Sequence, residues 1–308
     1  MNPNLVFFLS LTIILIGYVI KKAHIITEKE GEGIAKLILN VTLPALIFDV
    51  ITTLELVSEL FLLFFISLGF SVMVVSVGFV LFQNYDRQVK GILLMTSIGY
   101  NIGLFAYPII EGIWGIEGLQ HIALFDFGNA FVVFILCYVI AAIFSPKNGE
   151  DGKINGKYIL KKLVSSAPLV SFIIAVILNL FGFEFPLFLS ELIGVLSRAN
   201  MALTLLLLGI YLNFKFQKSE WVSVMKVLAI RYGFGLTVGL ILFFALPYSH
   251  LYRTILLVGL ILPVGMATVP FAVEYKYSDK LKKLTGIIVN LTITISFALM
   301  WLITLIIA

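Results

Sequence analysis

Apolar stretches long enough to cross a bilayer follow one another along almost the whole of this 308-residue chain. An α-helix needs about 20 apolar residues to cross the hydrocarbon core. Because 61% of the residues are hydrophobic and only 12% are charged, the pattern predicts an all-α membrane protein with ten transmembrane helices. The ten expected spans are 4–20, 33–53, 58–82, 91–110, 119–145, 166–182, 187–212, 222–246, 253–273 and 284–307.

Basic residues gather in alternate loops of this expected topology. They follow the first, third, fifth, seventh and ninth spans, whereas the opposite side carries only Arg253. Since cytoplasmic loops carry an excess of lysine and arginine, both termini are expected outside the cytoplasm. We therefore expect a multi-pass protein of the plasma (inner) membrane, and its basic charge reflects topology rather than binding to nucleic acid. The residues on the expected cytoplasmic side are Lys21, Lys22, Lys29, Lys36, Arg87, Lys90, Lys147, Lys153, Lys157, Lys161, Lys162, Lys215, Lys218, Lys226, Lys276, Lys280, Lys282 and Lys283.

A glycine followed by a proline five residues later occurs twice deep inside apolar stretches. The first pair is Gly103 and Pro108 in GLFAYP, and the second, 162 residues on, is Gly265 and Pro270 in GMATVP. Proline removes a backbone donor and glycine permits conformations that other residues avoid, so each pair predicts an interrupted helix. Ordinary kinks are the alternative, because glycine and proline are common in membrane helices.

The same shift of 162 residues superimposes the first five spans on the last five. Because five is an odd number, the second copy must enter the membrane from the opposite side, as in the inverted repeats of secondary transporters. We expect one repeat at 1–145, a cytoplasmic linker at 146–158 and a second, inverted repeat at 159–308. Helices four and nine would then cross as broken helices near the midplane, where their half-helix N-termini favour an anion.

Four motifs, in their order along the chain, resemble the auxin efflux carrier family of membrane permeases. The motifs are LNVTLPALIF at 39–48, GYNIGLFAYPII at 99–110, LFDFGNA at 124–130 and LPVGMATVPFAVEY at 262–275. The resemblance implies ten helices in two inverted repeats, akin to bile acid sodium symporters, with helices four and nine crossed and broken. It also implies transport of organic anions, including indole acetate in plants and small dicarboxylates in bacteria.

The resemblance also implies which residues form the transport site. The long central loop of plant members is replaced here by about a dozen residues, which is similar to the short prokaryotic permeases. The residues carried over are Asn40, Pro44, Asn101, Gly103, Pro108, Pro263, Gly265 and Pro270.

Ionisable residues inside membrane spans are costly, and so each is a functional candidate. Asp126 lies in span five with Asn129 three residues on, on the same helix face, and could hold a coupling cation or a proton. Arg231 in span eight and Arg198 in span seven could attract an anionic substrate, because a guanidinium matches a carboxylate. The alternative for all three is a structural ion pair, and for the two arginines also snorkelling toward a lipid headgroup.

Other polar residues receive no role in transport. Asp49 and Glu274 lie near span ends, where interfacial placement is expected. The sequons at 40–42 and 290–292 fall inside spans, where glycosylation cannot reach them. We expect no metal site, because no histidine or cysteine pair has metal-ligand spacing.

These observations favour a secondary active transporter of a small organic anion, working by alternating access. No enzyme motif such as HExxH or GxSxG occurs, so we expect neither an enzyme nor a cofactor. A passive anion channel or a membrane sensor is the alternative. The sequence leaves open the substrate, the direction of transport, coupling to Na⁺ or H⁺, and assembly as a homodimer. The other expected partner is the lipid bilayer.

Overall fold

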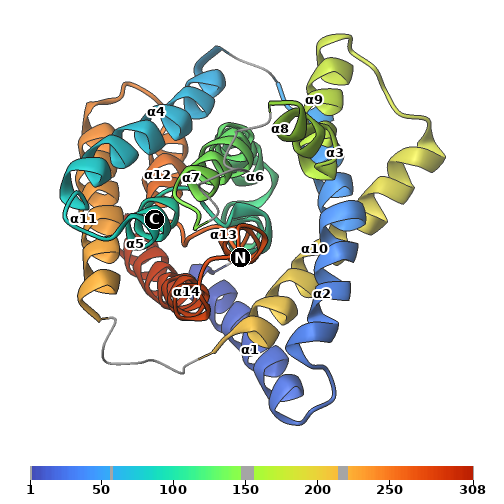
Figure 1. The fold of residues 1–308 in the computed structure, drawn as a ribbon. Helices are drawn as coiled ribbons and strands as arrows, with labels where there is room; N and C mark the ends of the chain where they lie inside the picture. Colours follow the sequence, from blue (N-terminus) through green and yellow to red (C-terminus); the bar gives the residue numbers. More distant parts are fainter. Residues whose placement is uncertain (1, 56–57, 147–155, 214–220, 308) are drawn as a thin grey trace. The chain divides into compact units, whose positions relative to one another are not determined.

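The computed structural model describes residues 2–55, 58–146, 156–213 and 221–307 (Figure 1). The regular elements of the described residues are all helical, and these residues form no β-strand. The predicted linker lies mostly outside them. The α-helices are α1 (Pro3–Lys22), α2 (Glu28–Leu37), α3 (Leu43–Thr52), α4 (Ser58–Leu81), α5 (Arg87–Ser97), α6 (Tyr107–Phe131), α7 (Tyr138–Ile143), α8 (Gly156–Val164), α9 (Ala167–Leu180), α10 (Leu187–Tyr211), α11 (Trp221–Ala245), α12 (His250–Leu260), α13 (Thr268–Glu274) and α14 (Asp279–Ile307). Three π-helical segments continue them: η1 (Ile38–Thr42), η2 (Ile102–Ala106) and η3 (Val132–Cys137).

Among the described residues, seven helical runs are long and apolar enough to cross a membrane. The all-α, multi-pass prediction therefore holds, whereas the count of ten spans is not confirmed. Two expected spans are represented by shorter apolar helices, α9 and α12, of 14 and 11 residues. At 1.5 Å per residue, neither reaches the roughly 30 Å thickness of the hydrocarbon core.

The run from 102 to 143 is 42 residues long and contains the end of the expected fourth span and all but the last two residues of the fifth. It is kinked at Gly115, whose φ of 62° and ψ of −153° are not helical. Only glycine adopts such a conformation readily, so the kink falls where the sequence allows it. Gly115 lies between the fourth and fifth windows expected from the sequence.

The chain divides into two compact units, each built from both halves of the sequence. The first comprises Met1–Phe61, Ile102–Phe127 and Lys161–Leu212, and the second comprises Leu62–Asn101, Gly128–Leu160 and Asn213–Ala308. Segments that are far apart along the chain therefore share one core. Compactness groups helices by packing rather than by chain order, so the two consecutive repeats expected from the sequence stay a prediction.

The first unit is built around α10, which packs against α1 and α3, while α3 packs against α9 (Figure 1). Helices α1 and α10 approach closely at two glycines. An added Cβ at Gly17 would overlap the carbonyl oxygen of Leu206, and one at Gly209 would overlap that of Ile14. Small residues allow this backbone approach between membrane helices.

In the second unit, α11 and α12 lie side by side (Figure 1), and α13 packs against α14. The contact between α11 and α12 again depends on a glycine, because a Cβ at Gly235 would overlap the carbonyl oxygen of Leu260. The same unit contains the whole of α5 and the whole of α12, the helices that lead into the candidate site.

Candidate functional site

The first interruption follows α5 and comprises Ile98–Asn101. Ile98 is extended, with φ −120° and ψ 175°, and Gly99 has a positive φ of 68°. A side chain at Gly99 would be strained by that φ and also crowded, because an added Cβ would lie 3.1 Å from Val133 Cγ2. The sequence requires glycine here.

The second interruption lies between Leu260, the last residue of α12, and Thr268, the first of α13. It contains Pro263 and Gly265, both buried. The two helices that the sequence predicts to be broken are therefore discontinuous in the structure. The first break lies upstream of Gly103, however, because the chain is helical again from Ile102.

The two interrupted segments pair with each other within the second unit. Tyr100 and Val264 form an isolated antiparallel bridge. The Asn101 N–H donates to the Pro263 carbonyl oxygen at 2.9 Å, and the Gly265 N–H donates to that of Gly99 at 3.4 Å. We call this arrangement the crossing. It satisfies backbone groups that would otherwise be exposed to hydrocarbon at a cost of several kcal/mol each.

Side chains from neighbouring helices satisfy further backbone groups of the crossing. The Asn129 amide pairs with Tyr100, accepting from its N–H at 2.7 Å and donating to its carbonyl oxygen at 3.0 Å. Thr292 Oγ1 accepts from the Val264 N–H at 3.1 Å, and Ser296 Oγ donates to the Ile261 carbonyl oxygen at 2.6 Å. Helices α6 and α14 thus hold one interruption each.

Arg231, from α11, lies within the crossing and is 1% exposed. Nε donates to the Leu262 carbonyl oxygen at 3.0 Å, and Nη1 donates to that of Ser97 at 3.1 Å. Nη2 donates to the carbonyl oxygens of Gly99, Leu262 and Pro263 at 2.8, 2.9 and 3.0 Å. The guanidinium also lies 4.5 Å from the centre of the Tyr100 ring.

These contacts bear on the predicted role of Arg231. Four of its side-chain hydrogen bonds end on backbone carbonyl oxygens of the two interruptions, and a fifth ends on that of Ser97, the last residue of α5. Its guanidinium therefore joins the two broken segments to α11, an arrangement that differs from both a substrate contact and an ion pair.

Asn101 is the residue of the crossing with unused hydrogen-bonding capacity. It is 5% exposed, and its side-chain Nδ2 is buried with no hydrogen-bond partner. Buried polar atoms without a partner are few in native proteins and call for an explanation such as a ligand or a water. Within the described part of the chain, the other such atoms belong to Ser10, Ser67 and Arg253.

Several predicted site residues lie in the first unit. Asn40 is exposed in η1 and donates from Nδ2 to the Lys36 carbonyl oxygen at 2.8 Å, one helical turn back. Pro44 is the second residue of α3 and directly follows the π-helical turn η1 within one continuous helical run. The buried polar pair of this region joins Thr42 Oγ1 to Asn200 Oδ1 at 2.9 Å.

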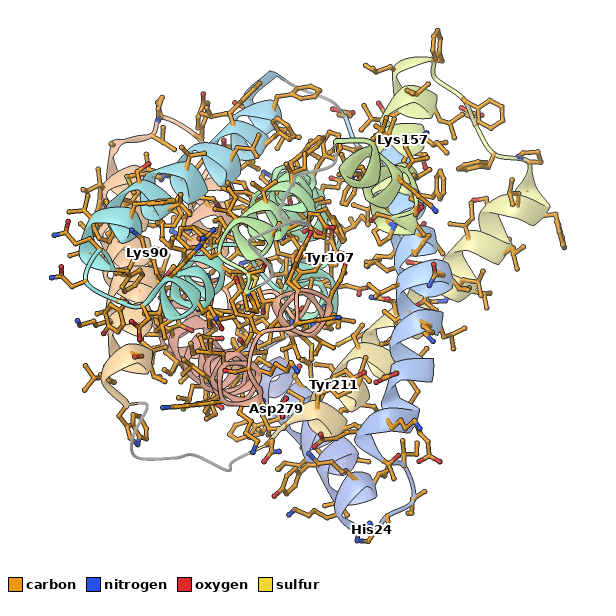
Figure 2. The ribbon with its side chains drawn as sticks, viewed as in Figure 1. His24, Lys90, Tyr107, Lys157, Tyr211 and Asp279 are labelled. Carbon is orange, nitrogen blue, oxygen red and sulfur yellow. The ribbon has the colours of Figure 1, made fainter. Side chains whose placement is uncertain are left out.

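The remaining predicted residues of the first unit lie on η2 and α6. Gly103 contacts Leu43, whose Cδ2 would be 2.9 Å from an added Cβ. Pro108 is buried as the second residue of α6. Asp126 is half-buried, and its Oδ2 accepts a hydrogen bond from the hydroxyl of Tyr107 at 2.9 Å; Tyr107 is labelled in Figure 2.

The crossing thus brings together Asn101, Asn129, Arg231, Pro263 and Gly265 out of the residues singled out in the sequence. Pro270 is exposed in the first turn of α13, and Arg198 is exposed on α10. The sequence interpretation gave no role to several other residues of the crossing. Gly99, Tyr100, Val264, Thr292 and Ser296 are among them.

Signals for two of these residues were present in the sequence. Gly99 directly precedes the Tyr-Asn pair of the GYNIGLFAYPII motif, and Thr292 is the threonine of the sequon in the last span. A hydroxyl in a position too buried for glycosylation is a candidate for a structural hydrogen bond.

Comparison with known proteins places the chain in a family. The chain matches the model of a family described as membrane transport protein over residues 6–307. The chain belongs to this family. The expected membership of the auxin efflux carrier family is thereby confirmed, and the protein is a multi-pass membrane protein of a transporter family.

Two relatives of this membrane transport protein are archaeal. An uncharacterized transporter of Methanocaldococcus jannaschii is 26% identical over 312 residues, which cover 97% of this chain and 96% of that protein. An uncharacterized transporter of Methanothermobacter thermautotrophicus is 25% identical over 268 residues, or 86% of each chain. Both relatives are named as transporters, and neither is named as an enzyme.

Proposed function

We propose that this membrane transport protein is a secondary active transporter of a small organic anion, moved by alternating access at the crossing. The observation that carries the proposal is the unpartnered Nδ2 of Asn101, buried beside two paired helix interruptions. Interrupted helices whose unwound backbone meets near the midplane are the usual transport sites of such folds. A carboxylate is the substrate group that this donor favours.

The proposal includes ten spans in two inverted repeats. In it, α5 and the η2–α6 segment up to Gly115 form span four, and α12 with α13 forms span nine. The contacts of the crossing support this assignment, because Val264 follows Tyr100 by 164 residues and Thr292 follows Asn129 by 163. Both separations are close to the 162-residue spacing of the sequence repeat.

In this proposal the anion lies where η2 begins, next to Asn101. The first N–H groups of a helix have no intrahelical acceptor and carry a partial positive charge, so they attract a carboxylate. Gly265 contributes to the close pairing of the two interruptions, because even an added Cβ would contact the Tyr100 carbonyl oxygen at 3.4 Å. Asp126, hydrogen-bonded to Tyr107, is the proposed carrier of a coupling proton or cation.

The test is counterflow in proteoliposomes that are preloaded with one unlabelled organic anion and given the same anion in labelled form. A carrier shows transient accumulation and saturation, whereas a passive channel shows neither. We expect Asn101→Ala to weaken the apparent affinity by about 10- to 150-fold, the loss of one hydrogen bond to a charged group. Asn84→Ala, in the exposed turn after α4, is the matched control.

If Asn101→Ala keeps the wild-type affinity for the anion, the substrate does not bind at the crossing. Flux without counterflow would instead favour the channel.

A further inference from the structure

Four backbone carbonyl oxygens converge on one side chain at the crossing. They belong to Ser97 at the end of α5, to Gly99 of the first interruption, and to Leu262 and Pro263 of the second. Carbonyl oxygens released by unwound helices are ligands for alkali and alkaline-earth cations, and in secondary transporters such groups hold the coupling Na⁺. Here the guanidinium of Arg231 lies among them.

The helix ends around Arg231 also favour a positive charge. Ser97 is the last residue of α5. Helix α12 ends at Leu260, two residues before Leu262, whose carbonyl oxygen accepts from Arg231. The C-terminal end of a helix carries a partial negative charge, and both helices have 11 residues. The face of the Tyr100 ring, 4.5 Å away, adds a further site for a cation.

We propose that Arg231 is a tethered cation that occupies the carbonyl cluster of the crossing in place of a bound metal cation. The proposal rests on the proposed transport function and specifies its coupling. The crossing then holds its positive charge throughout the transport cycle, and no Na⁺ binds between the two interruptions. Coupling to an ion, where it occurs, uses another group.

A purely structural arginine and a tethered cation are distinguished by which kind of group can substitute for the Arg231 side chain. Removing the guanidinium leaves four carbonyl oxygens, two helix C-termini and an aromatic face around an empty space. A free cation of suitable size then binds there, and only a cation restores the protein. A side chain that merely filled space would be replaced equally well by an apolar residue of similar length.

The experiment compares the purified full-length wild type with three variants, Arg231→Ala, Arg231→Met and Arg253→Ala. Arg253 is the matched control, because it donates to a backbone carbonyl oxygen, that of Phe243, and lies 5.2 Å from the Phe243 ring, at the opposite end of α12. Thermal unfolding is measured in about 10 mM guanidinium, Na⁺ or choline chloride. At these low concentrations guanidinium acts as a ligand rather than a denaturant.

We expect guanidinium to raise the Tm of Arg231→Ala by about 2–4 °C relative to choline, as a ligand of the folded state does. Na⁺ should give a smaller rise in the same variant. The wild type and Arg253→Ala should show no rise with either cation. Equal Tm values for Arg231→Ala in all three salts, or an equal Na⁺-dependent rise in the wild type, would overturn the proposal.

Transport provides the second readout, which also serves if Arg231→Ala cannot be purified. Arg231→Met fills a similar volume without charge and should lose at least about 90% of counterflow in choline. Arg231→Lys, which keeps the charge, should retain more counterflow than Arg231→Met, with no cation requirement. Wild-type counterflow by Arg231→Met would contradict the proposal.

The two proposals fail in different ways. If the wild type transports none of the organic anions tested, the proposed function is wrong. The thermal comparison needs no substrate, and it still decides whether the crossing holds a tethered cation.

Discussion

Gly99 shows how a single backbone conformation positions the crossing. Its φ of 68° turns the chain so that its carbonyl oxygen accepts from both Arg231 and the Gly265 N–H. A non-glycine residue in this region costs about 1–2 kcal/mol. The same residue would also push against Val133 and Cys137, whose side-chain atoms lie 3.1 and 3.2 Å from an added Cβ.

We therefore predict that Gly99→Ala lowers the free energy of unfolding by more than about 2 kcal/mol and impairs counterflow. Gly115→Ala is the control, because Gly115 has a similar φ of 62° with nothing within 4 Å of an added Cβ. It should cost only about 1–2 kcal/mol and leave transport intact. Unfolding in detergent and counterflow measure the two effects. Equal losses in both variants would show that crowding at Gly99 has no consequence.

A second residue-scale prediction concerns the carboxylate of Asp126. Asp126→Asn removes the charge and keeps a group that can accept from the Tyr107 hydroxyl, whereas Tyr107→Phe removes only that hydrogen bond. If Asp126 carries the coupling ion, Asp126→Asn abolishes the dependence of uptake on pH or Na⁺, and Tyr107→Phe keeps it. Counterflow, which needs no gradient, should persist in both. Unchanged ion dependence in Asp126→Asn would limit this carboxylate to a structural role.

At the scale of elements, the close contact of α1 and α10 depends on two glycines. We predict that Gly209→Ala lowers the free energy of unfolding by about 1–3 kcal/mol, because the added methyl group must push the helices apart. Gly69→Ala on α4 is the control, since no atom lies within 4 Å of its added Cβ. Size-exclusion chromatography after heating compares the apparent melting temperatures of the two variants with that of the wild type. If the two variants are equally stable, α1 and α10 do not pack at these glycines.

The interrupted helices show what the sequence could and could not predict. Glycine and proline in apolar stretches predicted two discontinuous helices, and both are present. Neither proline lies in an interruption, however. Pro270 lies in the first turn of α13, where no intrahelical bond needs its N–H, and Pro108 lies six residues after the chain becomes helical again at Ile102. The first interruption therefore lies ahead of Gly103, at a place signalled by Gly99.

Local sequence patterns could not predict which groups pair with each other at the crossing. Arg231 was predicted as a partner for an anion, because an arginine in a membrane span suggests a charged ligand or an ion pair. Its actual partners are backbone carbonyl oxygens of residues 31 to 134 positions away. No side-chain pattern encodes such acceptors, since every residue type carries the same carbonyl group.

At the scale of the whole molecule, the apolar windows predicted the fold class but not the number of spans. A window of 20 apolar residues does not distinguish one continuous helix from two shorter ones separated by a break, as at α12 and α13. Composition determines how favourably a segment transfers into the membrane, whereas the length of a continuous helix depends on local backbone geometry. The count of ten spans and the orientation therefore remain predictions.

Cysteine labelling tests this topology directly. The background is Cys137→Ser, because Cys137 is the single cysteine of the chain. We predict that a cysteine at Asn84, in the turn between α4 and α5, reacts with a membrane-impermeant reagent only from the cytoplasm. A cysteine at His250, at the start of α12, should react only from outside. Labelling of both from one side would contradict the positive-inside orientation.

The central claim is that an organic anion crosses the membrane at the crossing. The most direct measurement is counterflow of a labelled organic anion by the wild type, Gly265→Ala and Gly265→Leu in matched proteoliposomes. An added Cβ at Gly265 meets Tyr100 and Val133 at 3.4 Å or more, so alanine fits and leucine does not. The account predicts counterflow in the wild type and in Gly265→Ala, and its loss in Gly265→Leu despite normal insertion. Undiminished counterflow in Gly265→Leu would contradict it.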